Sequence, residues 1–76
     1  MDFSEYVRHT RLFYGLTQKE FAEKLGYKQT TISDVENKRK NASDRLRAAL
    51  IRNYPKSPEF ERFLYEIKQG GVNNGS

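Results

Sequence analysis

The sequence predicts an all-α domain built from five helices. Apolar residues recur at three- and four-residue steps in five segments, which is the periodicity of amphipathic helices. Glycine, proline or a run of basic residues separates these segments, and none of them alternates apolar with polar residues as a half-buried strand does. A chain of 76 residues forms one small domain, so its core must consist of few, well-packed side chains.

The first two predicted helices cover residues 3–14 and 18–25, with Gly15 between them. The apolar face of the first carries Phe3, Tyr6, Val7, Thr10 and Tyr14. Thr17 is a suitable N-cap for the second helix, because its hydroxyl accepts a hydrogen bond from an early backbone N–H group. Glu20, three residues later, completes a capping box.

The third predicted helix, residues 28–37, follows the second across a very short turn. Gly26 stands where a chain leaving a helix can enter the left-handed region without a Cβ penalty. Ala22 is small enough to let two helices approach closely near a right angle. Ile32 and Val35 point inward, and the sequence around the unit is basic. Such a two-helix unit is typical of proteins that place the second helix in a DNA major groove.

The fourth predicted helix begins near Ala42 or Ser43, with Asn41 or Ser43 as its cap, and ends before Pro55. It brings to one side Leu46, Ala49 and Leu50. The segment Ser57-Pro58-Glu59 predicts the start of the fifth helix. It combines a cap, a proline at the first helical position and an acid in the first turn.

The fifth helix carries an apolar stripe that has two open interpretations. The stripe consists of Phe60, Phe63, Leu64 and Ile67. It either packs on the body of the other four helices, which a small domain needs, or forms part of a dimer interface. We predict that the folded domain covers residues 1–69 and that the glycine-rich residues 70–76 form a flexible tail.

Composition narrows the function classes. The net charge is +4 and the sequence pI is near 9.5, which fits a polyanionic partner without proving one. The chain has no cysteine, so disulfides and thiolate metal sites are excluded. No stretch is apolar enough for a signal peptide or a membrane span, so we expect a cytoplasmic, nucleoid-associated protein.

No catalytic constellation is visible in the sequence. His9 is the only histidine, and its helical neighbours form no nucleophile–base set, so we interpret it as a solvated helix residue. No glycine-rich loop of the kind that cradles phosphates occurs. We expect no enzyme activity, no cofactor, no metal site and no small-molecule ligand.

The central part of the chain resembles the phage-repressor and Cro-like helix-turn-helix proteins, also called the XRE family. The resemblance covers roughly residues 7–52. It is carried by Arg11, Gly15-Leu16-Thr17-Gln18, Phe21-Ala22, Leu25-Gly26, Gln29-Thr30-Thr31-Ile32 and Val35-Glu36-Asn37. The resemblance implies a compact, five-helix, lambda-repressor-like fold whose helices 2 and 3 form the helix-turn-helix. It also implies binding to an operator on double-stranded DNA as a twofold dimer.

The resemblance places base-reading residues at the start of the third helix. They are Lys28, Gln29, Thr30 and, one turn later, Asp34. Gln29 can pair bidentately with adenine, and the methyl group of Thr30 can contact a thymine methyl group. Asp34 departs from the neutral or basic residue that is usual there. It accepts from cytosine N4, or it is a solvated or locally paired acid.

Phosphate contacts are implied at both ends of the unit. They are assigned to Gln18, Lys19, Thr31, Asn37, Lys38, Arg39, Lys40 and Asn41. The alternative for the basic run is a solvated loop. The family often has glycine where this chain has Lys38. Arg11 and Glu36 match an internal ion pair, whereas Gln18, Lys28, Gln29 and Thr30 are expected to face outward without a structural role.

These residues predict a sequence-specific transcriptional regulator. The expected type is a phage or mobile-element repressor that binds a palindromic operator as a dimer and blocks polymerase. One of the two interpretations of the stripe on the fifth helix places the dimer contacts there. The alternative is an antitoxin-like or anti-repressor-like module that uses the same fold to bind a protein, an interpretation that the acidic Asp34 favours.

Overall fold

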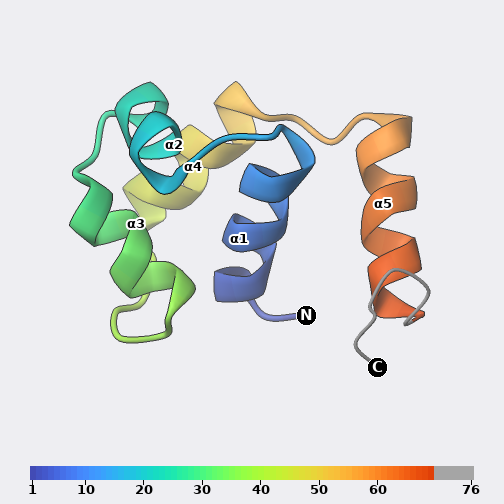
Figure 1. Ribbon diagram of the computed structural model, residues 1–76, viewed down its shortest axis with the longest axis horizontal. Coiled ribbons are helices and arrows are strands. Elements are labelled where there is room, and N and C mark those ends of the chain that lie inside the picture. The colour runs from blue at the N-terminus through green and yellow to red at the C-terminus, as the bar shows by residue number, and fades with distance from the viewer. Residues whose placement is uncertain (70–76) are drawn as a thin grey trace.

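The structure is a computed structural model that describes residues 1–69, and five helices without any strand make up this range (Figure 1). They are α1 (Phe3–Phe13), α2 (Gln18–Leu25), α3 (Gln29–Glu36), α4 (Asp44–Asn53) and α5 (Pro58–Lys68). The predicted all-α fold class is therefore confirmed. The predicted α1 was one residue too long at its C-terminal end, and the predicted α3 was one residue too long at both ends. The extra residues, Tyr14, Lys28 and Asn37, are helix caps. The predicted tail lies outside the described residues.

Side-chain caps fix where most of the helices begin. Asp2, Thr17, Ser43 and Ser57 each accept a hydrogen bond from the backbone N–H group three residues ahead. Asn41 is not the cap of α4. Helix α3 differs from the other four, because its N-cap residue is Lys28 and no side chain caps it.

Left-handed residues end both helices of the helix-turn-helix. Gly26 has φ +81°, and the Tyr27 N–H group then donates to the Ala22 carbonyl oxygen at 2.8 Å. Lys38 has φ +64°, and the Arg39 N–H group donates to the Asp34 carbonyl oxygen at 2.8 Å. These are equivalent terminations, but only the first uses the residue that adopts a positive φ without a steric penalty.

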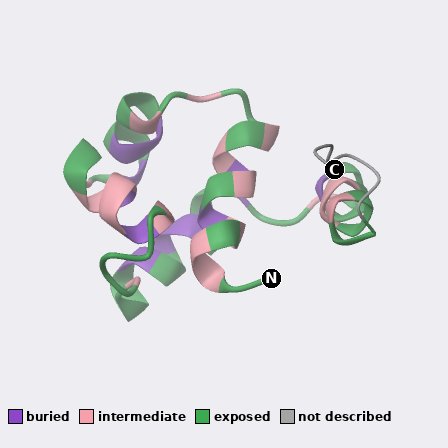
Figure 2. Cartoon of the chain, turned by 60° about the horizontal axis from the view of Figure 1, so that its bottom comes forward, coloured by how far each residue is buried: buried purple, intermediate pink, exposed green. Residues whose placement is uncertain are grey.

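One core cluster joins the first four helices, α1, α2, α3 and α4. Its buried members are Val7, Phe21, Ala22, Leu25, Ile32, Val35, Leu46, Ala49, Leu50 and Tyr54. Figure 2 shows that buried residues gather where the helices meet, while the outer faces are exposed. Ala22 is 1% exposed, as expected for a small residue between two closely packed helices. Tyr14, which the sequence placed on the inner face of α1, is 39% exposed, although its ring centroid lies 4.8 Å from that of the buried Tyr54.

Helix α5 stands at the edge of the molecule and packs mainly on α1 (Figure 1). Aromatic rings make this contact. The ring centroids of Phe13 and Phe60 are 4.9 Å apart, and those of Phe13 and Phe63 are 5.2 Å apart. Phe60 is 0% exposed, so its side chain belongs to the core and is not available to a second copy. Phe60 therefore follows the core-packing interpretation of the stripe.

The described part of the chain has no helix of the length and apolarity that crossing a membrane requires.

His9 differs from its interpretation as a solvated residue. Its ring lies edge-on to Phe63 on α5, and its Nδ1 atom is buried without a hydrogen-bond partner within residues 1–69. Burial, and then the neighbouring Arg8 charge, lower the pKa of His9 below its ordinary value of 6.5.

Candidate nucleic-acid interface

Glu36 connects the three helices that carry the candidate interface. The Arg11 Nε atom on α1 donates to Glu36 Oε2 at 2.8 Å, and Arg11 Nη2 donates to Oε1 at 3.1 Å. The Gln18 Nε2 atom, at the start of α2, donates to the same Oε1 at 3.1 Å. The Glu36 side chain is only 4% exposed, so its charge is shielded from water and matched by these donors. This cluster fixes the start of α2 against the end of α3.

Gln18 therefore has a structural role that the sequence did not reveal. We expected Gln18 to face outward without an internal partner. That prediction is wrong, because its amide nitrogen donates a hydrogen bond to Glu36. The two residues are 18 positions apart in the chain, and no local periodicity links them. The bond holds the half-buried Gln18 side chain at the N-terminus of α2, where backbone N–H groups also favour an anion.

The start of α3 is open to solvent. Lys28, Gln29 and Thr30 are all exposed, whereas Ile32 and Val35 on the opposite face are buried in the core. Thr31 is half-buried and Lys19, in the first turn of α2, is exposed. The two outward-facing amide and hydroxyl side chains of Gln29 and Thr30 thus stand on a helix whose other face is immobilised. They can offer donors and acceptors to a base edge.

Asp34 is held locally. Its Oδ1 atom lies 3.7 Å from Nη1 of Arg39, and its side chain is 36% exposed. Its carbonyl oxygen also accepts from the N–H groups of Arg39 and Lys40. This geometry matches the interpretation of Asp34 as a locally paired acid. Arg39 lies in the basic loop, so the pair offsets part of the repulsion between the carboxylate and a nearby phosphate.

The basic loop after α3 does not present its three cations in the same way. The Lys38 Nζ atom lies 2.9 Å from Asp2 Oδ2 and 3.8 Å from Glu5 Oε2, so it is directed toward the start of α1. Lys40 and Asn41 are exposed, and Lys40 forms no ion pair within residues 1–69. Asn37 is exposed and bonds to Ser33 through its side chain. Lys40 is therefore the loop cation with the fewest competing contacts.

The Lys38–Asp2 pair also affects the two ionisable groups. The N–H group of Glu5, followed by Lys38, holds the pKa of Asp2 below its ordinary value of 3.8. The hydrogen bond to Asp2 and its charge raise the pKa of Lys38 above 10.5. Both groups are therefore ionised at neutral pH. Because both side chains are about half exposed, a phosphate can compete for this lysine at little cost.

Comparison with protein families shows which family this arrangement of helices belongs to. A family model described as helix-turn-helix matches residues 10–60, which include α2, α3 and α4. The chain belongs to the XRE family of helix-turn-helix proteins. It is thus a DNA-binding transcription regulator of the XRE type. Searches of curated proteins and of solved structures found no significant match.

Family membership makes α2 and α3 the helix-turn-helix and α3 its second, recognition helix. One exposed cation near this XRE unit was missed in the sequence. Arg45 lies in the first turn of α4, directly after the basic loop and the Ser43 cap. No group of metal-ligating side chains occurs within residues 1–69.

Proposed function

We propose that the chain is a sequence-specific repressor of phage or mobile-element type. A dimer binds a palindromic operator, places one α3 helix in each of two successive major grooves and excludes polymerase. The half-site centres lie about one helical turn, roughly 10 bp, apart. The DNA partner would keep the protein with the nucleoid.

A single observation carries this proposal. Gln29 and Thr30 are exposed at the start of a helix that the Glu36 cluster and the core hold in place. Side chains on a fixed helix keep the geometry that base recognition requires, whereas side chains on a mobile loop lose entropy on binding. The exposed Lys19 and Lys40 on either side can neutralise phosphates and set the register.

The test compares one base-reading and one phosphate-binding variant on an operator selected from a random DNA pool. We expect Gln29→Ala to lose about 1–3 kcal/mol of binding free energy on that operator but little on random DNA. We expect Lys40→Ala to weaken binding to both sequences alike and to reduce the salt slope by about one. An equal loss on both sequences for Gln29→Ala would contradict base reading.

The alternative is a protein-interaction module of the antitoxin or anti-repressor type. Asp34 is the residue that favours it, and the Asp34–Arg39 pair weakens this support because it partly neutralises the acid. Retention on heparin against salt separates the two functions. Release at low salt, together with no enrichment of any DNA sequence from the random pool, would support protein binding.

A further inference from the structure

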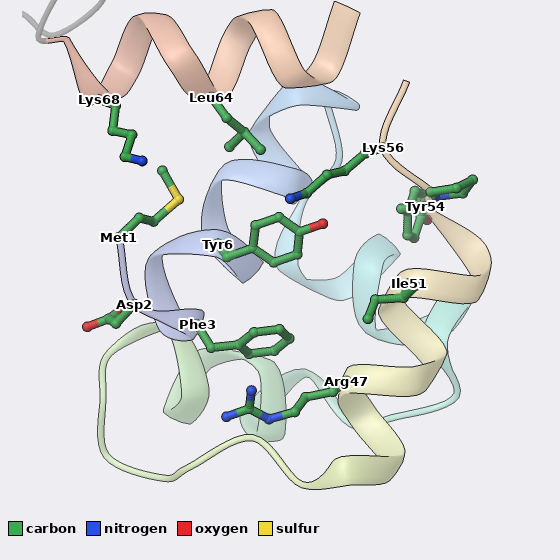
Figure 3. Close-up of a pocket in the computed structure, with 11 residues that line it drawn as sticks. Met1, Asp2, Phe3, Tyr6, Arg47, Ile51, Tyr54, Lys56, Leu64 and Lys68 are labelled. Carbon is green, nitrogen blue, oxygen red and sulfur yellow. The ribbon is translucent and has the colours of Figure 1, made fainter. Parts of the chain in front are cut away.

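A groove of about 770 Å³ runs between α1, α4 and α5 (Figure 3). The rings of Phe3 and Tyr6 on α1 lie in the middle of the view. Ile51 extends from α4 on one side, and Leu64 extends from α5 on the other. The volume is within the range of sites that hold small molecules, about 300–1,000 Å³. The groove shares no lining residue with the predicted DNA contacts.

The apolar lining of this groove is accessible. Ile51 is 58% exposed, although it is a large aliphatic residue in the middle of α4. Phe3 and Tyr6 are half-buried and pack against the core cluster, so they form a firm floor. On the surface of a small domain, large apolar side chains are usually exposed one at a time. Here α1, α4 and α5 bring them to one concave surface.

The charges around the groove are almost all positive. Arg47, Lys56 and Lys68 line it, and Asp2 is the one carboxylate among the described lining residues. Asp2 is already paired with Lys38 at 2.9 Å. Neither Arg47 nor Lys56 has an ion-pair partner within residues 1–69. The rim therefore carries uncompensated positive charge next to an apolar floor.

Two of these cations lie over the aromatic floor. The guanidinium carbon of Arg47 is 4.3 Å from the centroid of the Phe3 ring, and Lys56 Nζ is 5.5 Å from the centroid of the Tyr6 ring. These contacts keep the two exposed charges beside the groove. Figure 3 shows the two cations on opposite sides of the ring pair, Arg47 beside Phe3 and Lys56 beside Tyr6. An anionic group therefore meets one of them directly, and an attached apolar body covers the rings and Ile51.

We propose that this groove binds a small amphipathic carboxylate, with its apolar body on Phe3, Tyr6 and Ile51 and its carboxylate at Arg47, whose guanidinium can donate two parallel hydrogen bonds. Lys56 adds positive charge at the other side of the rings. The charge complementarity excludes a cationic ligand of the same shape. Because α5 and α4 form opposite sides of the groove, a bound carboxylate links two helices that have few other contacts with each other.

The test uses decanoate, below its micelle-forming concentration and without DNA, with decyltrimethylammonium and decyl glucoside as head-group controls. Amide and methyl chemical shifts locate the site, and calorimetry measures the affinity. We expect saturable shifts at Phe3, Tyr6, Ile51 and Leu64 with decanoate, and at least several-fold weaker binding of both controls. Equal binding of the three ligands, or shifts centred elsewhere, would overturn the proposal.

Charge variants examine the assignment of the head group. Arg47→Gln should weaken decanoate binding about fivefold, Lys56→Gln only about twofold, and the double variant about tenfold, as for exposed charges. Arg52→Gln is the matched control, because Arg52 is exposed on α4 but does not line the groove. If Arg52→Gln weakened decanoate binding equally, the effect would come from the net charge of the protein and not from the groove, which would contradict the proposal. A dimer that Ile51→Asp dissociates, with no decanoate binding, would assign the groove to a second copy instead.

Discussion

Individual residues of this chain combine local strain with interactions that span the fold. Lys38 occupies a left-handed position at φ +64°, where L-residues other than glycine are disfavoured by about 1–2 kcal/mol. In return its amine reaches Asp2 at the start of α1. An exposed ion pair of this kind stabilises little, because water and salt screen it. The backbone penalty and the side-chain gain are thus opposite in sign.

Two substitutions at position 38 separate these effects. Lys38→Ala removes the ion pair but keeps the Cβ atom, whereas Lys38→Gly removes both. We expect the glycine variant to be more stable than the alanine variant by about 1 kcal/mol, because both lose the ion pair and only one relieves the strain. Urea unfolding measures the difference. Equal stabilities would mean that residue 38 does not adopt a positive φ in solution.

His9 gives the domain a pH-dependent stability. Its folded-state pKa is lowered from 6.5, chiefly by burial and then by Arg8. The unfolded chain therefore takes up the proton first as the pH falls. Stability is then lost as the pH falls through the unfolded-state pKa near 6.5, and this group causes no further loss once the pH is below the lowered folded-state pKa. His9→Phe keeps an aromatic ring beside Phe63 but cannot titrate.

The measurement is the free energy of unfolding of both proteins from pH 8 to 5. We expect the wild type to lose stability over this range and the His9→Phe variant to stay nearly constant, since His9 is the only histidine in the chain. Parallel curves for the two proteins would show that burial at His9 does not penalise its charged form.

At the scale of helices, local signals predicted most element boundaries. Thr17 with Glu20 and Ser57 with Pro58 act at the positions that their residue types favour. The sequence could not show that Gln18 bonds to Glu36, because only the crossing of α2 and α3 brings them together. It also missed Phe13, whose contacts with Phe60 and Phe63 arise from the packing of α5 on α1.

Helix α3 is the element whose start conflicts with helix stability. Its N-cap is Lys28, which makes no capping bond, so we expect Lys28→Ser to stabilise the domain by about 0.5–1 kcal/mol. The same change removes a cation from the proposed base-reading set and should weaken operator binding. Ser43→Ala is the control, because it deletes an existing cap bond of 3.1 Å and should cost about 1 kcal/mol. A less stable Lys28→Ser variant would indicate that lysine has an unrecognised structural role.

At the scale of the whole molecule, the helix-turn-helix and α5 are attached in different ways. The central cluster fixes α1 to α4, whereas α5 adds to α1 through an aromatic contact that includes Phe60 and Phe63. The predicted apolar stripe of α5 thus divides into a buried residue, Phe60, and three half-buried ones, Phe63, Leu64 and Ile67. Periodicity identified the stripe but could not assign its parts, because burial within one chain and burial between two copies favour the same residue types.

The half-buried part of the stripe leads to the last prediction. If a dimer forms through Phe63 and Ile67, a charge at position 67 must be buried or the interface must open. We expect Ile67→Glu to be monomeric in sedimentation velocity and to bind the palindromic operator roughly a hundredfold more weakly, because the two half-sites are no longer linked. Its affinity for an isolated half-site should not change.

Tyr65→Glu is the matched control for this experiment. Tyr65 is 63% exposed. It precedes Ile67 by two positions and therefore lies on the opposite side of α5, so the same charge there should leave the dimer intact. A dimer that survives Ile67→Glu, or one that Tyr65→Glu disrupts equally, would exclude this face of α5 as the interface. The two halves of the operator would then have to be linked through another surface, and α5 would serve only to complete the fold.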